Sequence, residues 1–167
     1  YRLLHVISRR LRRLPNSSRS RFANKLGALA FNRIPIRKKQ AIQNIKTAFP
    51  DKNGAWVNHV LKGSYRLVST NFMEFLALPK SFDSLNFRVE NQHIIDEASQ
   101  QGKGVLIITG HFGLWEILGS WLGKNGYPVW GIIQRQGNKG ADVFVKEWRE
   151  SYGMKHIYRK SSLDKMY

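Results

Sequence analysis

The segment T-G-H-F-G-L-W-E-I, residues 109–117, constrains the fold of this chain more than any other feature. It follows the apolar run Val105–Ile108, which is typical of a buried strand. The residues after it have the spacing of one helical face, which comprises Trp115, Leu118, Trp121 and Leu122. A strand that leads into a helix predicts an open α/β sheet, and such sheets usually carry their chemistry at the carboxyl ends of their strands.

Within this segment, His111 and Glu116 are candidates for a catalytic pair. In one continuous helix they would lie roughly 140° apart around the axis and would not face each other. Gly110 and Gly113 permit a sharp turn, so His111 can lie in the loop while Glu116 occupies the first helical turn. We then expect the carboxylate to bind one imidazole nitrogen, which would make His111 a general base facing a cleft. The alternative is a core histidine bonded to the backbone.

The pattern along the whole chain predicts a helical N-terminal third followed by alternating strands and helices. Such alternation indicates an α/β fold with a mostly parallel sheet. Breaks are expected at Pro15–Ser18 and at Pro35, and Pro79 is expected to close the longest helix. The buried face of that helix is predicted to contain Trp56, Val60, Leu67, Val68, Phe72, Phe75 and Leu76. Helices are predicted near 1–14 and over 22–32, 37–49, 55–77, 92–101, 113–124 and 141–152, and strands over 87–90, 105–108, 129–134 and 155–158.

Length and composition indicate one globular domain in a chain of 167 residues. The absence of Cys excludes disulfides, thiolate zinc sites and a cysteine nucleophile, and it is consistent with a reducing compartment. No His or acidic cluster has metal-ligand spacing, and no complete P-loop or dinucleotide fingerprint occurs. Because the first residue is Tyr1, we expect a fragment or a processed form.

The net charge of +17 is distributed unevenly along the chain. Residues 1–50 contain 13 Lys and Arg and no Asp or Glu, whereas the other 117 residues contain 15 basic and 11 acidic side chains. This asymmetry indicates an anionic partner, either nucleic acid or a membrane surface. The two classes differ in salt dependence, since phosphate neutralisation on DNA gives a steep logarithmic slope.

The first segment favours a membrane surface. It alternates Leu and Ile with Arg at helical spacing, which is typical of a helix lying in the membrane interface; the apolar residues are Leu3, Leu4, Ile7, Leu11 and Leu14. Two alternatives remain, a basic helix that packs on its own domain and a transit peptide rich in Arg and Ser. No stretch of 18 apolar residues occurs, so no spanning helix is predicted.

Three segments of the sequence carry a recognisable combination of motifs. The first is R-K-K-Q-A-I-Q-N-I-K-T-A-F-P-D, residues 37–51. The second is G-K-G-V-L-I-I-T-G-H-F-G-L-W-E, residues 102–116, and the third comprises I-I-Q-R-Q, residues 132–136, and W-R-E-S-Y-G-M-K-H-I-Y-R-K, residues 148–160. Together they resemble the bacterial lipid A biosynthesis acyltransferases, within the lysophospholipid acyltransferase superfamily, and this resemblance places His111 and Glu116 on the catalytic dyad.

The resemblance implies an enzyme that transfers a fatty acyl group from a thioester to a hydroxyl of a glycolipid or lysolipid. It implies no cofactor, with an acyl carrier protein or coenzyme A thioester as donor. It also implies phosphate or substrate binding by Arg135, Arg149 and Arg159; the alternative for each of these Arg is a surface or ion-pair residue. It also implies a peripheral protein on the cytoplasmic face of the bacterial inner membrane. We expect residues 1–35 to form a basic membrane-surface arm and residues 36–167 the first part of an acyltransferase domain, truncated at the C-terminus.

Direct attack by the acceptor hydroxyl fits this chain better than an acyl-enzyme route, because no Ser lies in a G-x-S-x-G turn. The rival functions are a basic nucleic-acid-binding module and a non-catalytic membrane-binding protein. Loss of acyl transfer on replacement of His111 distinguishes the enzyme from the second rival.

Overall fold

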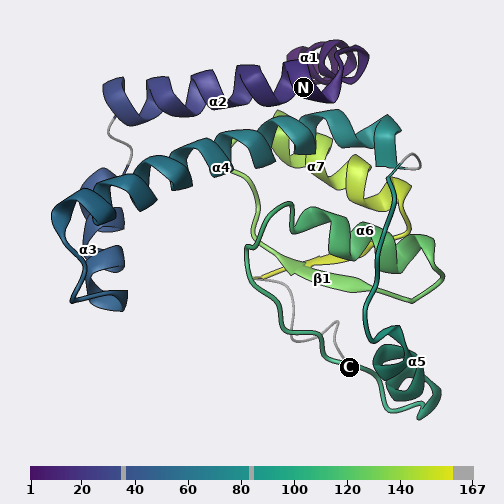
Figure 1. The fold of residues 1–167 in the computed structure, drawn as a ribbon. Helices are drawn as coiled ribbons and strands as arrows, with labels where there is room; N and C mark the ends of the chain where they lie inside the picture. The colour runs from purple at the N-terminus through teal and green to yellow at the C-terminus, as the bar shows by residue number, and fades with distance from the viewer. Residues whose placement is uncertain (35–36, 83–84, 160–167) are drawn as a thin grey trace.

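The computed structural model describes residues 1–34, 37–82 and 85–159. The part described is mostly helical and contains a small parallel sheet (Figure 1). Its elements in chain order are α1 (Arg2–Arg13), α2 (Asn16–Arg33), α3 (Lys38–Ala48), α4 (Gly54–Ser81), α5 (Gln92–Gln100), α6 (Glu116–Lys124), β1 (Trp130–Ile133), α7 (Lys139–Ser151) and β2 (Lys155–Tyr158).

The long helix α4 organises the N-terminal half. Asn53 caps its N-terminus, because the Asn53 side chain accepts a hydrogen bond from the Trp56 N–H. α2 lies along the length of α4 (Figure 1). The two helices approach closely at Gly27, where an added Cβ would lie 2.6 Å from the Cα of Arg66. Nearby, Arg19 of α2 is buried and its guanidinium binds the Glu74 carboxylate of α4, with Nη2 to Oε2 at 2.9 Å.

A β1–α7–β2 unit lies beneath the C-terminal part of α4 (Figure 1). β1 and β2 pair in parallel, with Trp130 opposite Lys155 and Ile133 opposite Tyr158, as expected for strands joined by a crossover helix. Gly153 has a positive φ of 80° and follows α7 closely, where an αL residue lets the chain leave the helix. The predicted helix over 141–152 and strands over 129–134 and 155–158 are therefore confirmed, within two residues at each end.

α6 packs on the turn between α7 and β2 through its glycines. A Cβ added to Gly123 would lie 2.2 Å from the carbonyl oxygen of Tyr152, and all three of its nearest atoms belong to backbone. Gly119 similarly faces the Met154 side chain, whose Sδ would lie 2.6 Å from an added Cβ. The absence of side chains at these two positions allows the helix to rest directly on the turn.

The sheet is smaller than predicted. In the part of the chain the structure describes, β1 and β2 are the strands, and neither 87–90 nor 105–108 pairs with a neighbour. Leu106 and Ile108 are 81% and 88% exposed, so the expected central strand before the His111 loop is wrong. Apolar content predicts burial, but a strand forms only where a second strand supplies backbone partners.

The apolar faces predicted for α4 and α1 also differ in part from the faces that are buried in the structure. On α4, Leu67, Val68 and Phe72 are more than half exposed, while the buried residues of this helix include Val57, Leu61, Leu76, Ala77 and Leu78. Pro79 does not close the helix, which runs on to Ser81. The predicted break at Pro15–Ser18 shortens to Leu14 and Pro15, since α2 begins at Asn16, and Pro35 lies outside the described residues.

On α1, Leu11 belongs to a core cluster with Leu76 and Phe144, and Leu4 and Ile7 pack against it. Ser8 is fully buried and donates a 2.7 Å hydrogen bond to the carbonyl of Leu76. The predicted membrane-facing side of α1 is therefore divided. Leu4, Ile7 and Leu11 pack inward, so the prediction is wrong for these three residues, whereas Leu3 and Leu14 are exposed. Among the described helices, none has the length and apolar character needed to cross a bilayer.

Candidate functional site

The loop that carries His111 turns by means of its two glycines. Gly113 has a positive φ of 51°, and the Phe112 N–H donates a 3.0 Å hydrogen bond to the carbonyl of Gly110. α4 anchors this loop, since the side-chain amide of Asn71 donates a 2.8 Å hydrogen bond to the carbonyl of Gly113. The His111 loop is therefore attached to α4 through Asn71 and continues directly into α6.

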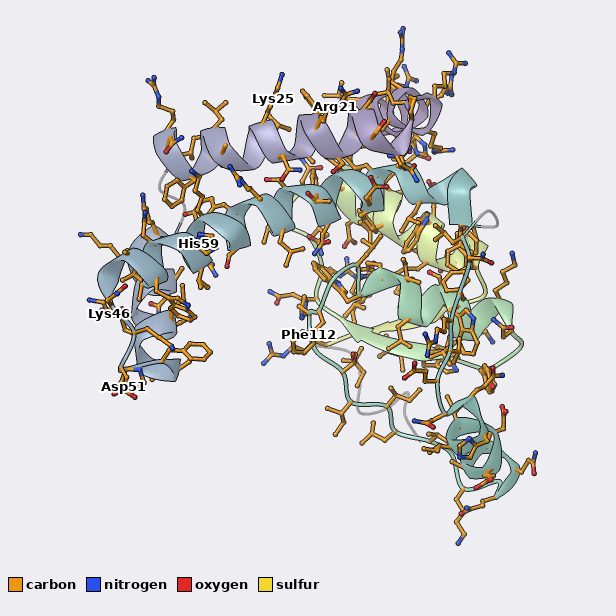
Figure 2. All side chains as sticks on the ribbon, in the orientation of Figure 1. Arg21, Lys25, Lys46, Asp51, His59 and Phe112 are labelled. Atoms are coloured by element: carbon orange, nitrogen blue, oxygen red, sulfur yellow. The ribbon has the colours of Figure 1, made fainter. Side chains whose placement is uncertain are left out.

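His111 lies on the surface of this loop. Its ring packs against Trp115, with centroids 4.6 Å apart and planes inclined by 49°. The neighbouring Phe112 is 86% exposed and projects from the loop (Figure 2). The imidazole is exposed and therefore accessible from solvent. The alternative interpretation, a core histidine bonded to the backbone, is wrong.

Glu116 is the first residue of α6 and so lies in the first helical turn, as predicted, although the helix begins three residues later than the predicted start at Gly113. Its carboxylate binds Arg149 of α7. The Arg149 Nε lies 2.9 Å from Oε2, and Nη2 lies 2.5 Å from Oε1. The two side chains are only 12% and 11% exposed. Among the described hydrogen bonds of Glu116, none joins its carboxylate to His111, so the predicted dyad bond is not present in this conformation.

The three predicted phosphate ligands separate into two groups. Arg149 forms an ion pair with Glu116, which agrees with the ion-pair alternative and not with the phosphate-binding role. Arg135 follows β1 and Arg159 follows β2, and because Ile133 pairs with Tyr158 in a parallel register, both Arg lie at the carboxyl edge of the sheet. The Arg135 guanidinium stacks over the Tyr158 ring, 4.3 Å from its centroid.

Asp142 holds the loop that carries Arg135. Its carboxylate accepts a 2.8 Å hydrogen bond from the Gln136 N–H and a 2.9 Å hydrogen bond from the Tyr158 hydroxyl. The bond from Gln136 is the main cause that lowers the pKa of Asp142, with smaller contributions from Tyr158 and Arg135. Burial, followed by the bond to Asp142, raises the pKa of Tyr158.

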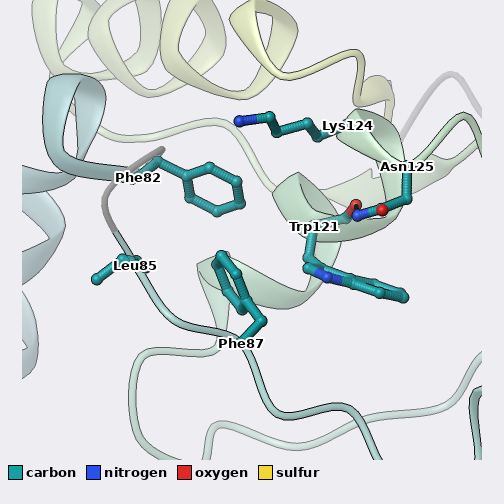
Figure 3. Close-up of a pocket in the computed structure, with 6 residues that line it drawn as sticks. All are labelled: Phe82, Leu85, Phe87, Trp121, Lys124 and Asn125. Carbon is teal, nitrogen blue, oxygen red and sulfur yellow. Dashed lines mark hydrogen bonds between the residues drawn. The ribbon is translucent and has the colours of Figure 1, made fainter.

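The structure has a pocket that does not lie at His111. It is a pocket of about 260 Å³ at the opposite end of α6 from Glu116, and Lys124 and Asn125 form part of its wall (Figure 3). The other lining residues are Phe82, Leu85, Phe87 and Trp121. The expectation that His111 faces a cleft is therefore not met by this pocket.

Sequence reasoning did not identify Asn71, nor the link between Glu116 and Arg149. Arg149 lies 33 residues from Glu116, and Asn71 lies 42 residues from Gly113, so no local pattern connects either pair. Within the described ranges, no group of three or more His, Asp or Glu side chains is placed to hold a metal ion. The site thus combines an exposed imidazole, a carboxylate five residues later that is held by an Arg, and two basic side chains at a sheet edge.

Comparison with protein families matches residues 3–167 to the family model of the bacterial lipid A biosynthesis acyltransferases. The match spans both the His111 loop and the β1–α7–β2 unit. Comparison with curated proteins and with solved structures gave no match.

Proposed function

The chain belongs to the bacterial lipid A biosynthesis acyltransferase family, and we propose that it moves a fatty acyl group from a thioester to a hydroxyl of a glycolipid or lysolipid acceptor. Acyltransferase chemistry follows from the family. The observation that carries the finer proposal is the His111–Glu116 segment at a loop–helix junction, within a match that covers almost the whole chain.

His111 is the general base in this proposal. It accepts the proton of the acceptor hydroxyl while the hydroxyl oxygen attacks the thioester carbonyl carbon. The tetrahedral intermediate then collapses with cleavage of the carbon–sulfur bond, and the imidazolium returns the proton to the departing thiolate. The products are an ester and a free thiol, so the step needs no cofactor. The donor is an acyl carrier protein or coenzyme A thioester.

Glu116 assists by stabilising the imidazolium form of His111. An ionised carboxylate offers about four lone-pair sites, and the Arg149 pair occupies two of them. The others remain for the imidazole N–H once substrate binding orders the exposed ring. Trp115 supports this assignment because it lies next to Glu116 in the chain and already contacts the His111 ring.

Arg135 and Arg159 bind phosphate groups of the acceptor or donor. Guanidinium groups match phosphate oxygens in a bidentate manner, and these two follow neighbouring parallel strands. Asp142 supports the site by holding the loop after β1 through the Gln136 N–H. Arg149 is not included in this phosphate site, because its Nε and Nη2 are already directed to a carboxylate.

The decisive experiment replaces His111 with Ala and measures acyl transfer from an acyl carrier protein thioester to a lipid A precursor. His111→Ala should abolish transfer while leaving thermal stability unchanged, because the residue is exposed. His59→Ala is the matched control, since His59 is an exposed histidine on α4 (Figure 2). Near wild-type turnover in His111→Ala would remove the catalytic assignment.

We also propose that the chain attaches to the cytoplasmic surface of the inner membrane through the outer faces of α1 and α2. Arg21 and Lys25 project from α2 on the side away from α4 (Figure 2). Several large apolar residues of these helices and of the turn between them are also exposed, namely Leu3, Val6, Leu14, Phe22 and Leu29. Basic side chains flanked by exposed apolar ones match an anionic lipid interface, where both charge and burial contribute.

Vesicle binding tests this surface without unfolding the protein. Arg21→Ser/Lys25→Ser should weaken binding to anionic vesicles by about 2 kcal/mol, or roughly 30-fold, at about 1 kcal/mol for each basic residue. Lys46→Ser/Lys103→Ser removes the same charge from other exposed positions and should bind nearly as well as the wild type. Equal losses in both variants would show that net charge, and not this face, governs attachment.

A further inference from the structure

Arg149 and Glu116 form a two-point ion pair that joins α7 to α6. One edge of the guanidinium meets both carboxylate oxygens, with Nε to Oε2 at 2.9 Å and Nη2 to Oε1 at 2.5 Å. This is the geometry in which an Arg–carboxylate pair fixes orientation as well as charge. A lysine at this position could supply the charge but not the two parallel bonds.

The pair is shielded from solvent. The Arg149 and Glu116 side chains are 12% and 11% exposed, whereas both members of the ion pair between Arg88 and Glu90 are largely in water, at 89% and 70%. Removing one partner of a shielded pair leaves the other charged without compensation, which does not happen at an exposed pair. Glu116 therefore depends on Arg149 for its position.

The surrounding core holds both ends of this pair rigidly. Trp148, next to Arg149, is 3% exposed and belongs to a buried cluster with Phe82. Leu114 and Ile117, which flank Glu116 in the chain, pack against the same cluster. The backbone on each side of the ion pair is consequently fixed by apolar contacts, so the two side chains lose little further freedom when they bind.

We infer that Arg149 is a positioning residue for the acyl-transfer reaction and not a ligand for substrate phosphate. It holds the Glu116 carboxylate at the start of α6 and leaves the remaining lone-pair sites of that carboxylate available to the imidazolium of His111. This inference rests on the proposed function, because it assigns Arg149 a role only through Glu116. It places the effect of Arg149 in the turnover step and not in the binding of acceptor or donor.

Steady-state kinetics of the full chain test this role with the variants Arg149→Gln, Arg149→Lys, Glu116→Gln and the double variant Glu116→Gln/Arg149→Gln. Arg149→Gln should lower kcat on the order of 10- to 100-fold, the range for groups that orient a functional side chain, with KM unchanged. Arg149→Lys should recover part of the loss. The double variant should be no slower than Glu116→Gln alone, because Arg149 then has no carboxylate to hold.

Three controls separate the possible failures. Arg88→Gln removes an Arg from an exposed ion pair and should retain full activity. The folded fraction of each variant, measured by circular dichroism at the assay temperature, corrects kcat for any loss of folded protein. His111→Ala in the same assay reports on the proposed function alone. An active His111→Ala variant would contradict the proposed function. An inactive His111→Ala variant together with a fully active Arg149→Gln variant would contradict only the role of Arg149.

Three further results would overturn the inference. A higher KM for the phosphorylated acceptor with unchanged kcat in Arg149→Gln would make Arg149 a substrate ligand. Losses that multiply in the double variant would show that Arg149 and Glu116 act independently. A loss of kcat in Arg149→Gln that the folded fraction fully accounts for would assign the ion pair a structural role and no other.

Discussion

Replacement of Gly123 by Ala tests how closely α6 packs on the turn between α7 and β2. The added Cβ would lie 2.2 Å from the Tyr152 carbonyl oxygen and within 3.0 Å of two more backbone atoms, those of Gly153 and Met154. Ordinary contacts begin at 3.4 Å, so the helix or the turn must move by about 1.2 Å or more. Backbone atoms cannot rotate away as the end of a side chain can, so the whole element has to shift.

The magnitude follows from two opposing effects. Overpacking of this kind costs about 1–3 kcal/mol, and the backbone contacts place Gly123→Ala at the upper end. The better helix propensity of Ala returns about 1 kcal/mol. We therefore expect a net loss of about 2 kcal/mol in the free energy of unfolding, or a Tm lower by about 4–8 °C for a chain of this length.

Gly63→Ala is the matched control because Gly63 lies inside α4 and an added Cβ there meets nothing within 4 Å. It should gain the propensity term alone, about 1 kcal/mol, and raise the Tm by about 2–4 °C. Thermal denaturation monitored by circular dichroism measures both variants. Equal or higher stability of Gly123→Ala relative to Gly63→Ala would refute the close seating of α6.

The same substitution has a functional consequence. Glu116 begins α6 and Gly123 lies two turns along it, so a shift of the helix moves the carboxylate relative to Arg149. A misplacement of about 1 Å near a reacting group can cost about 100-fold in rate. Gly123→Ala should therefore lower kcat for acyl transfer, whereas Gly63→Ala should leave it unchanged.

Three further predictions concern the fold around the site. Gly27→Ala should destabilise the protein by about 1–3 kcal/mol in urea denaturation, because its Cβ would meet the backbone of α4 at 2.6 Å; a neutral effect would contradict the close packing of α2. Arg19→Met should cost about 2–4 kcal/mol in the same assay, since it leaves the partly buried Glu74 unpaired, and a cost below that of an exposed pair would argue against burial of this contact. The hydrogen bond from the Gln136 N–H lowers the pKa of Asp142. The stabilisation that Asp142 contributes is therefore complete above its ordinary pKa near 3.8 and is lost as the pH falls from there through the lowered pKa. Asp142→Asn should consequently reduce the loss of stability at acid pH in a plot of the free energy of unfolding against pH.

Much of the secondary structure was predictable because its causes are local. Gly153 and the apolar spacing before it indicated the end of α7, and Asn91 preceded a helix that begins at Gln92. The parallel pairing of β1 and β2 followed from the helix between them. The failure at Val105–Ile108 has the opposite cause, since an apolar run specifies that a segment avoids water but not which strand will pair with it.

The candidate site was predictable only in its outline. The glycines around His111 and the helical pattern after it indicated that His111 lies in a loop and Glu116 in the first turn of a helix, and both residues lie there. The partner of Glu116 was not predictable, because Arg149 also carried the features expected of a phosphate ligand. Charge and residue type were the same for both roles, and only the packing of Trp148 placed the guanidinium at the carboxylate.

Local sequence patterns were enough to predict most helices, the β1–α7–β2 unit, the basic N-terminal part and the loop that presents His111, because each depends on residues close together in the chain. Contacts between distant elements determine that Leu4, Ile7 and Leu11 of α1 pack inward, that Leu67 and Val68 of α4 remain exposed, and that Glu116 binds Arg149. The physical reason is that an amphipathic pattern defines an apolar side without naming its neighbour. Which surfaces meet is set by close approach between distant elements, here permitted by Gly27 between α2 and α4 and by Gly123 beneath α7.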